Sequence, residues 1–141
     1  MNKATQYIQH PHGLSMTGKS TYSVLYIEDN EANRLLIQLI LERKEYLELF
    51  AATDGRSGIK AAQEILPDVI LLDISLPDMN GYAVLAALRN DPATHQIPVI
   101  AISGEFPPRI PRDAPFVFEK YLPKPIEIAP LYEAIDEFLR L

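Results

Sequence analysis

The sequence contains no cysteine. Disulfide bonds, zinc–thiolate sites and thiol catalysis are therefore excluded. Long apolar runs are also missing, because no stretch approaches the ~20 residues that a membrane-spanning helix requires. The N-terminus lacks the apolar core of a secretory signal. From these absences we expect a cytoplasmic protein with no direct contact with a membrane.

Positive charge is in deficit. The chain has 13 lysine and arginine residues against 19 aspartate and glutamate residues, and its net charge is −6. Such a chain is repelled by the phosphates of DNA and by anionic lipids, so we expect no direct binding to nucleic acid. The length of 141 residues, with 48% hydrophobic and 23% charged residues, is typical of one globular domain with a substantial core.

Residues 1–21 are polar and show little hydrophobic periodicity. We interpret them as a flexible N-terminal leader before a single domain at 22–141. The leader contains Gly13–Ser20, which matches the P-loop pattern letter for letter, but a P-loop follows a strand and opens a helix. Here a proline flanked by His10 and His12 precedes the pattern and a predicted strand follows it, which argues against nucleotide binding. A solvated tail is also favoured over metal binding by the two histidines.

Short apolar runs alternate with helical patterns from residue 22 onward. Strands are expected at residues 22–27, 46–52, 69–73, 97–102 and 121–122. Helices are expected after Asn30, after Asp54-Gly55, around 82–88 and from Ile128 to the C-terminus. This alternation predicts an α/β fold, a doubly wound parallel sheet with helices on both faces.

The sequence yields further expectations for two of these elements and for the segment between Gly104 and Phe116. The first helix is expected to begin at Asn30 as its N-cap, and its apolar face is predicted from residues at helical spacing. These residues are Ala32, Leu35, Leu36, Leu39 and Ile40. The strand at 46–52 is of mixed character and is expected at a sheet edge. Between Gly104 and Phe116 four prolines exclude a helix of ordinary length, because proline has no N–H and clashes with the preceding turn.

Four of the five expected strands end in polar residues: Glu28-Asp29, Asp73, Ser103 and Lys124. Parallel strands joined by right-handed crossovers point the same way, so these ends converge on one rim of the sheet. Three crowded carboxylates repel one another unless a cation lies among them, and oxygen ligands select a hard ion such as Mg²⁺. A lysine ammonium and a serine hydroxyl add donors for an anionic oxygen group. Such a set suits phosphoryl transfer, in which an aspartate is itself able to act as the nucleophile.

With these residues in view, the chain from about Tyr22 to Leu141 resembles a response-regulator receiver domain, of the CheY-like superfamily of two-component signalling. The resemblance rests on Glu28-Asp29, on Asp73 with Pro77 and Gly81 at the family's spacing, on Ser103, and on Lys124-Pro125. It implies a flavodoxin-like, five-stranded parallel sheet in the order 2-1-3-4-5. The fourth helix of the family is expected here to be short, irregular or missing.

The resemblance also implies a reaction. Asp73 would accept a phosphoryl group from a phosphohistidine and pass a signal in a phosphorelay. Mg²⁺ or Mn²⁺ would be held by Glu28, Asp29, Asp73 and the backbone carbonyl of Ser75. The chain is then expected to catalyse only its own phosphorylation and dephosphorylation.

Further roles follow from the same resemblance. Ser103 and Lys124 would bind the phosphoryl oxygens. Tyr121, three residues before the lysine, would be the aromatic switch residue that turns inward when Ser103 swings toward the phosphate. Ser75 and Glu105 match two variable positions that tune how long the phosphoryl group lasts.

The implied partners are proteins. A histidine kinase or histidine phosphotransfer protein would present its phosphohistidine at the rim beside the first helix, and a downstream protein would read the switch. Residues 29–34 and 91–94 resemble receivers attached to hybrid histidine kinases. A stand-alone regulator and a domain of a longer kinase both stay open, as does whether the molecule dimerises.

Two other functional classes compete with the receiver hypothesis. A Mg²⁺-dependent phosphatase or phosphotransferase could act on a small molecule through an aspartyl-phosphate, but haloacid-type enzymes need a second aspartate two residues after the nucleophile. That position is Ser75. A degenerate receiver could instead serve as a constitutive binding module, against which the intact acidic pair, Asp73 and Lys124 argue.

Overall fold

The computed structural model of the chain describes residues 5–7 and 21–139. The strands are β1 (Thr5–Tyr7), β2 (Tyr22–Ile27), β3 (Leu47–Ala52), β4 (Val69–Asp73), β5 (Val99–Ser103) and β6 (Lys120–Pro123). The helices are α1 (Glu31–Leu41), α2 (Gly55–Ile65), α3 (Gly81–Arg89) and α4 (Ile128–Leu139). Within the described ranges, no helix is both long and apolar enough to cross a bilayer.

The six strands form one sheet in the order β1-β3-β2-β4-β5-β6. The pairs from β3 through β6 are all parallel, so the five parallel strands follow the predicted order 2-1-3-4-5. The pairing of β1 with β3 is antiparallel and was not predicted, because three residues are too few to display a strand pattern. The expectation that residues 46–52 form an edge strand is therefore wrong, since β1 covers β3. The P-loop match and the two leader histidines lie outside the described residues.

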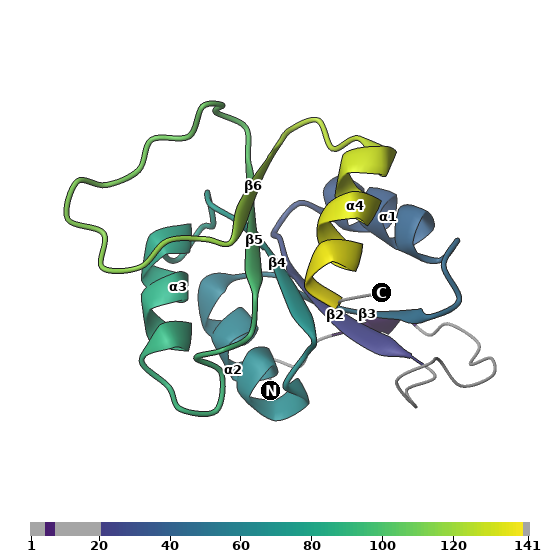
Figure 1. Cartoon of the computed structure of the whole chain (residues 1–141), viewed down its shortest axis with the longest axis horizontal. Coiled ribbons are helices and arrows are strands. Elements are labelled where there is room, and N and C mark those ends of the chain that lie inside the picture. The colour runs from purple at the N-terminus through teal and green to yellow at the C-terminus, as the bar shows by residue number, and fades with distance from the viewer. Residues whose placement is uncertain (1–4, 8–20, 140–141) are drawn as a thin grey trace.

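Helices cover both faces of the sheet, as predicted (Figure 1). One core cluster lies between the sheet and helices α1 and α4, and the other between the sheet and helices α2 and α3. Every residue of β4 and β5 is buried. These two strands are apolar runs without polar alternation, because a central parallel strand has no face that meets water.

Side-chain caps fix where three helices begin. Asn30, Asp54 and Asn80 each accept a hydrogen bond from the backbone N–H three residues ahead, and Asp54 forms a full capping box with Ser57. The N-cap predicted at Asn30 is confirmed. Each cap follows the carboxyl end of a strand, so the caps define the loops at the edge where the polar side chains lie.

The apolar face predicted for α1 is wrong. Leu35, Leu36 and Leu39 are 50%, 42% and 63% exposed; of the predicted residues Ile40 alone is buried, together with Ile37 and Leu41, which were not predicted. This helix has apolar residues on more than one side, and periodicity alone does not say which side meets the sheet. The three leucines form an exposed apolar surface on α1.

No helix forms in residues 104–119, all of which the structure describes. We call residues 104–117 the proline segment; it projects as a long loop between β5 and β6 (Figure 1). This confirms the expectation that the fourth helix of the family is missing. Beyond the segment, Glu119 accepts two hydrogen bonds from Arg89 at 2.8 and 3.0 Å and one from the N–H of Val99 at 2.7 Å. The chain entering β6 is thereby tied to the end of α3 and the start of β5.

Gly58 allows α2 to lie directly on β2. A Cβ at this position would stand 2.5, 2.8 and 2.9 Å from three side-chain atoms of Ile27. We expect Gly58→Ala to lower the free energy of unfolding by about 1–2 kcal/mol, because overpacking outweighs the gain in helix propensity. Denaturant unfolding measures the change. Gly104→Ala is the matched control, since nothing lies within 4 Å of its added Cβ. A Gly58→Ala protein as stable as the wild type would contradict this account of the packing.

Candidate functional site

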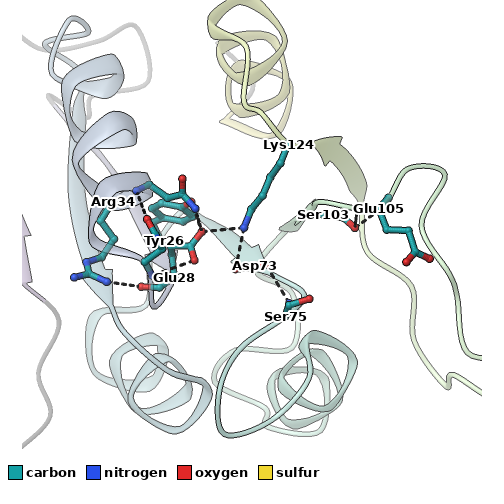
Figure 2. Close-up of polar contacts among 10 residues, drawn as sticks. Tyr26, Glu28, Arg34, Asp73, Ser75, Ser103, Glu105 and Lys124 are labelled. Carbon is teal, nitrogen blue, oxygen red and sulfur yellow. Dashed lines mark hydrogen bonds and ion pairs between the residues drawn. The ribbon is translucent and has the colours of Figure 1, made fainter.

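The polar residues at the carboxyl ends of β2, β4, β5 and β6 converge at one edge of the sheet (Figure 2). The register explains why. Ile27 pairs with Leu72, and Asp73 pairs with Ile102, so adjacent strands end within a residue of one another. The side chains at these strand ends therefore lie close together at the carboxyl edge of the sheet.

Three carboxylates meet there. One oxygen from each of Glu28, Asp29 and Asp73 lies within 4.8 Å of the other two. Glu28 and Asp73 are buried, at 1% and 3% exposed, whereas Asp29 is exposed to solvent. The cluster offers carboxylate oxygens open to water on one side, which is a donor set that could hold a hard metal ion.

Lys124 is the cation that the structure places against these acids. Its Nζ lies 3.1 Å from Oδ2 of Asp73 and 3.4 Å from Oε1 of Glu28. Burial by itself lowers the pKa of Lys124, but the carboxylate of Asp73, and then that of Glu28, raise it above its usual range. One ammonium among three carboxylates leaves an excess of negative charge that a divalent cation would offset.

The remaining oxygen of Asp73 is also fixed. Oδ1 accepts a hydrogen bond of 3.0 Å from the N–H of Ser75. The buried carboxylate therefore has a partner at each oxygen, which is how a buried charge is accommodated. Its orientation is set by the turn that follows β4 and by the lysine that follows β6.

Glu28 is held by residues whose part in the site the sequence analysis missed. Its Oε1 accepts a hydrogen bond from the hydroxyl of Tyr26 at 2.9 Å (Figure 2). It accepts a second from the side-chain amide of Asn33 at 3.1 Å. Arg34 donates to its backbone carbonyl at 2.9 Å. Burial, and after it the charge of Glu28, raise the pKa of Tyr26 above its usual range, so its proton stays available for donation. The sequence does hold a clue to this contact: Tyr26 and Glu28 are two residues apart, and in an extended strand such residues point to the same face.

Ser103 stands at the end of β5 beside this cluster, but its hydroxyl is directed elsewhere. The hydroxyl donates to the carbonyl of Glu105 at 2.8 Å and accepts from the N–H of Glu105 at 3.1 Å, away from Asp73 (Figure 2). Ser75, Ser103 and the start of the proline segment line a pocket of about 140 Å³.

Two further predicted site residues lie outside the acidic cluster. The carboxylate of Glu105 is 59% exposed and pairs with Arg109 at 2.9 Å. The hydroxyl of Tyr121 lies 2.9 Å from that of Tyr82 on α3. The structure thus brings together Glu28, Asp29, Asp73 and Lys124, places Ser103 beside them, and keeps Glu105 and Tyr121 apart.

Chemically, this arrangement fits transfer of a phosphoryl group. It combines a fixed carboxylate able to act as a nucleophile, an adjacent ammonium and oxygen atoms that could bind a metal. Phosphoryl transfer depends on positioning and on neutralising negative charge.

Comparisons with known proteins point the same way. The profile of the response regulator receiver domain matches residues 24–136. The polar-differentiation response regulator DivK of Brucella ovis is 35% identical over 124 residues, covering 84% of this chain and 97% of DivK. The response regulator PleD of Caulobacter vibrioides is 41% identical over 81 residues, covering 57% of this chain and 18% of PleD.

A solved structure shares the fold. The receiver domain of the sensor histidine kinase PA1611 from Pseudomonas aeruginosa PAO1 superposes with a TM-score of 0.74 at 24% identity, covering 86% of this chain and 99% of that one. That crystal structure has a magnesium ion coordinated in its active-site cleft.

The hydrogen bond from Tyr26 to Glu28 yields a stability prediction. Tyr26→Phe removes the hydroxyl from a buried carboxylate, and we expect the free energy of unfolding to fall by about 1.5–3 kcal/mol, as for bonds to charged groups. Tyr46→Phe is the control, because its hydroxyl bonds to Asp136 at 2.9 Å in a partly exposed place. The control should lose only about 0.5–1.5 kcal/mol. Equal losses in the two variants, measured by denaturant unfolding, would count against a special role of Tyr26.

Proposed function

The chain belongs to the response regulator receiver domain family, which serves two-component phosphorelay signalling, and on this premise we propose that it accepts a phosphoryl group on Asp73. The donor is a phosphohistidine of a histidine kinase or of a histidine phosphotransfer protein. Phosphorylation switches the binding of a downstream protein. The cytoplasmic location expected from the sequence is part of this proposal.

One observation carries the assignment. Asp73 is the carboxylate at which the parts of the site meet: it lies on the central strand, 3% exposed, bonded to Lys124 and within 4.8 Å of the two other acids. Glu28 and Asp29 are proposed as metal ligands rather than as the nucleophile, and Oε1 of Glu28 accepts hydrogen bonds from Tyr26 and Asn33.

Magnesium fits this donor set. The three carboxylates supply only oxygen ligands, and Asp29 leaves the cluster open to the water molecules that Mg²⁺ retains. We propose that the ligands of the ion are Glu28, Asp29, Asp73 and the backbone carbonyl of Ser75, and that Mn²⁺ is able to replace Mg²⁺. When bound, the ion neutralises negative charge on the carboxylates and on the transferred group.

The proposed reaction is an in-line displacement. A carboxylate oxygen of Asp73 attacks phosphorus, the P–N bond to the histidine breaks, and the imidazole keeps the bonding electron pair. The product is an acyl phosphate. Lys124, now 3.1 Å from Asp73, holds a phosphoryl oxygen in the product.

The switch follows from the same change. Ser103 leaves the backbone of Glu105 and donates its hydroxyl to a phosphoryl oxygen, and Tyr121 then moves into the space beside β5. This is a shift between two packings of one fold. Ser75 and Glu105 are proposed to influence the lifetime of the acyl phosphate, with Glu105 acting through the pocket that it lines together with Ser103.

A small-molecule phosphatase is not favoured. The position two residues after Asp73 carries a serine, which supplies no carboxylic acid for the leaving group. The matched family consists of signalling regulators. We propose that the chain's catalysis is limited to its own phosphorylation and dephosphorylation.

The exposed leucines of α1 are the proposed contact for the donor protein. The helix begins two residues after Asp29, so Leu35, Leu36 and Leu39 lie on the element that leads away from the site. Exposed apolar clusters on a protein surface commonly mark interaction sites. A donor seated on them would bring its phosphohistidine to the rim.

Labelling with radioactive acetyl phosphate tests the assignment of Asp73. In the presence of Mg²⁺ the wild type should take up about one label per chain, stable to acid and labile to hydroxylamine, as expected for an acyl phosphate. Asp73→Asn should take up none while keeping its fold, because it removes the nucleophile with little change of shape. Asp78→Asn is the matched control: this nearby carboxylate caps α2 through the N–H groups of Gly55 and Arg56 and should not affect labelling.

The same assay tests the metal. Excess EDTA should abolish labelling, and Asp29→Asn should raise the Mg²⁺ concentration needed for half-maximal labelling. Label on Asp73→Asn, or undiminished labelling in EDTA, would contradict the proposal.

Leu39→Lys tests the docking surface. We expect transfer from a histidine kinase that phosphorylates the wild type to slow about tenfold or more, since a charge placed in an apolar contact costs binding energy. Labelling by acetyl phosphate should not change, because it needs no docking. Leu66→Lys, at a 53% exposed leucine beyond the far end of α2, should leave both rates unchanged. Normal transfer to Leu39→Lys would exclude this surface.

A further inference from the structure

Three aromatic rings meet between α3 and β6. The hydroxyls of Tyr82 and Tyr121 lie 2.9 Å apart, and one donates a hydrogen bond to the other. The ring of Phe118 contacts both rings edge-on, with centroid distances of 5.1 Å to Tyr82 and 5.5 Å to Tyr121. The ring of Tyr121 is therefore fixed at its hydroxyl and along its side.

Phe118 has a firm position although it follows the proline segment. It is 5% exposed, and the next residue, Glu119, is bound to Arg89 and to the backbone of Val99. Val117, immediately before it, is 66% exposed. Phe116, two residues earlier, is partly buried against the same core cluster, so the chain is anchored from Phe116 to Glu119 just before β6.

Ser103 and Tyr121 are neighbours on one face of the sheet. Tyr121 pairs with Ala101 in the ladder between β5 and β6, and Ser103 lies two residues further along β5 on the same face. In this arrangement the Ser103 hydroxyl is directed at Glu105 and the Tyr121 hydroxyl at Tyr82. If Tyr121 follows Ser103 toward Asp73, its bond to Tyr82 must break.

We propose that Tyr82 is a positioning residue of the switch: its hydroxyl holds Tyr121 against α3 and so favours the arrangement in which Ser103 is turned away from Asp73. A contact made in one of two packings biases the population toward that packing. Tyr82 thereby raises the phosphoryl occupancy needed to switch the protein. The proposal rests on the proposed function of Asp73, and it adds a residue of α3 that sets the threshold.

The bond persists at neutral pH. Burial, and after it the hydrogen bond to Tyr121, raise the pKa of Tyr82 above its usual range, so this phenol remains protonated.

Tyr82→Phe tests the proposal because it deletes the hydroxyl and keeps the ring that packs on Phe118. Beryllofluoride, an analogue of the phosphoryl group, is titrated with Mg²⁺ while the amide of Gly104 and the ring of Tyr121 are followed by NMR. The midpoint should fall about two- to tenfold, which is the range that the loss of one neutral hydrogen bond gives. Tyr46→Phe is the control: it also loses a hydroxyl hydrogen bond, to Asp136, but neither residue belongs to the aromatic cluster, so the midpoint should stay at the wild-type value.

The outcomes separate this proposal from the proposed function. An unchanged or higher midpoint in Tyr82→Phe would overturn the positioning role, because a purely structural loss does not tighten binding. If the wild type fails to bind beryllofluoride, the proposed function fails, and the spectra of the free proteins decide about Tyr82. In those spectra, changes in the chemical shifts of both the Tyr121 ring and the Gly104 amide in Tyr82→Phe would support the positioning role. Chemical shifts identical to those of the wild type would overturn it.

Discussion

The pairing of Lys124 with the buried carboxylates of Asp73 and Glu28 is the interaction on which the site depends. A buried carboxylate loses several kcal/mol of hydration and is tolerated only when it is paired and hydrogen-bonded. The lysine that pairs with Asp73 lies 51 residues away in the sequence. The parallel sheet, with β4 and β5 buried along their whole length, joins these two ends, so the stability of the core and the chemistry of the rim share one framework.

The missing helix bears on the proposed switch. Between β5 and β6 the proline segment starts directly after Ser103, whose hydroxyl bonds to the backbone of Glu105, and ends directly before Phe118, which packs on Tyr121. Of the two proposed switch residues, Ser103 therefore contacts the first end of this loop, and Tyr121 contacts the residue that follows its last. In the proposed switch, a change at Asp73 that draws Ser103 away would release the first end of the segment without rearranging a packed helix.

The sequence predicted most of the fold and the main site for a physical reason. Apolar runs identify central strands, and parallel strands must end at one edge, so Glu28, Asp73 and Lys124 were expected together. The apolar face of α1 could not be chosen from periodicity, because Ile37 and Leu39 are both apolar and only packing decides between them. The directions of the Ser103 and Tyr82 hydroxyls depend on rotamers and local turns, which composition does not encode. The role of Tyr26 was not predicted, because in the sequence it is one residue of an apolar strand and nothing there shows which group its hydroxyl contacts.

The most direct test of the central claim is to locate the phosphoryl group chemically. Borohydride reduces an acyl phosphate to an alcohol, so a phosphorylated aspartate becomes homoserine, which tandem mass spectrometry identifies. One tryptic peptide, residues 61–89, contains Asp68, Asp73 and Asp78 and offers its own internal comparison. The account predicts homoserine at position 73 and unmodified aspartate at the other two. Homoserine at position 68 or 78, or at no position in a labelled sample, would contradict it.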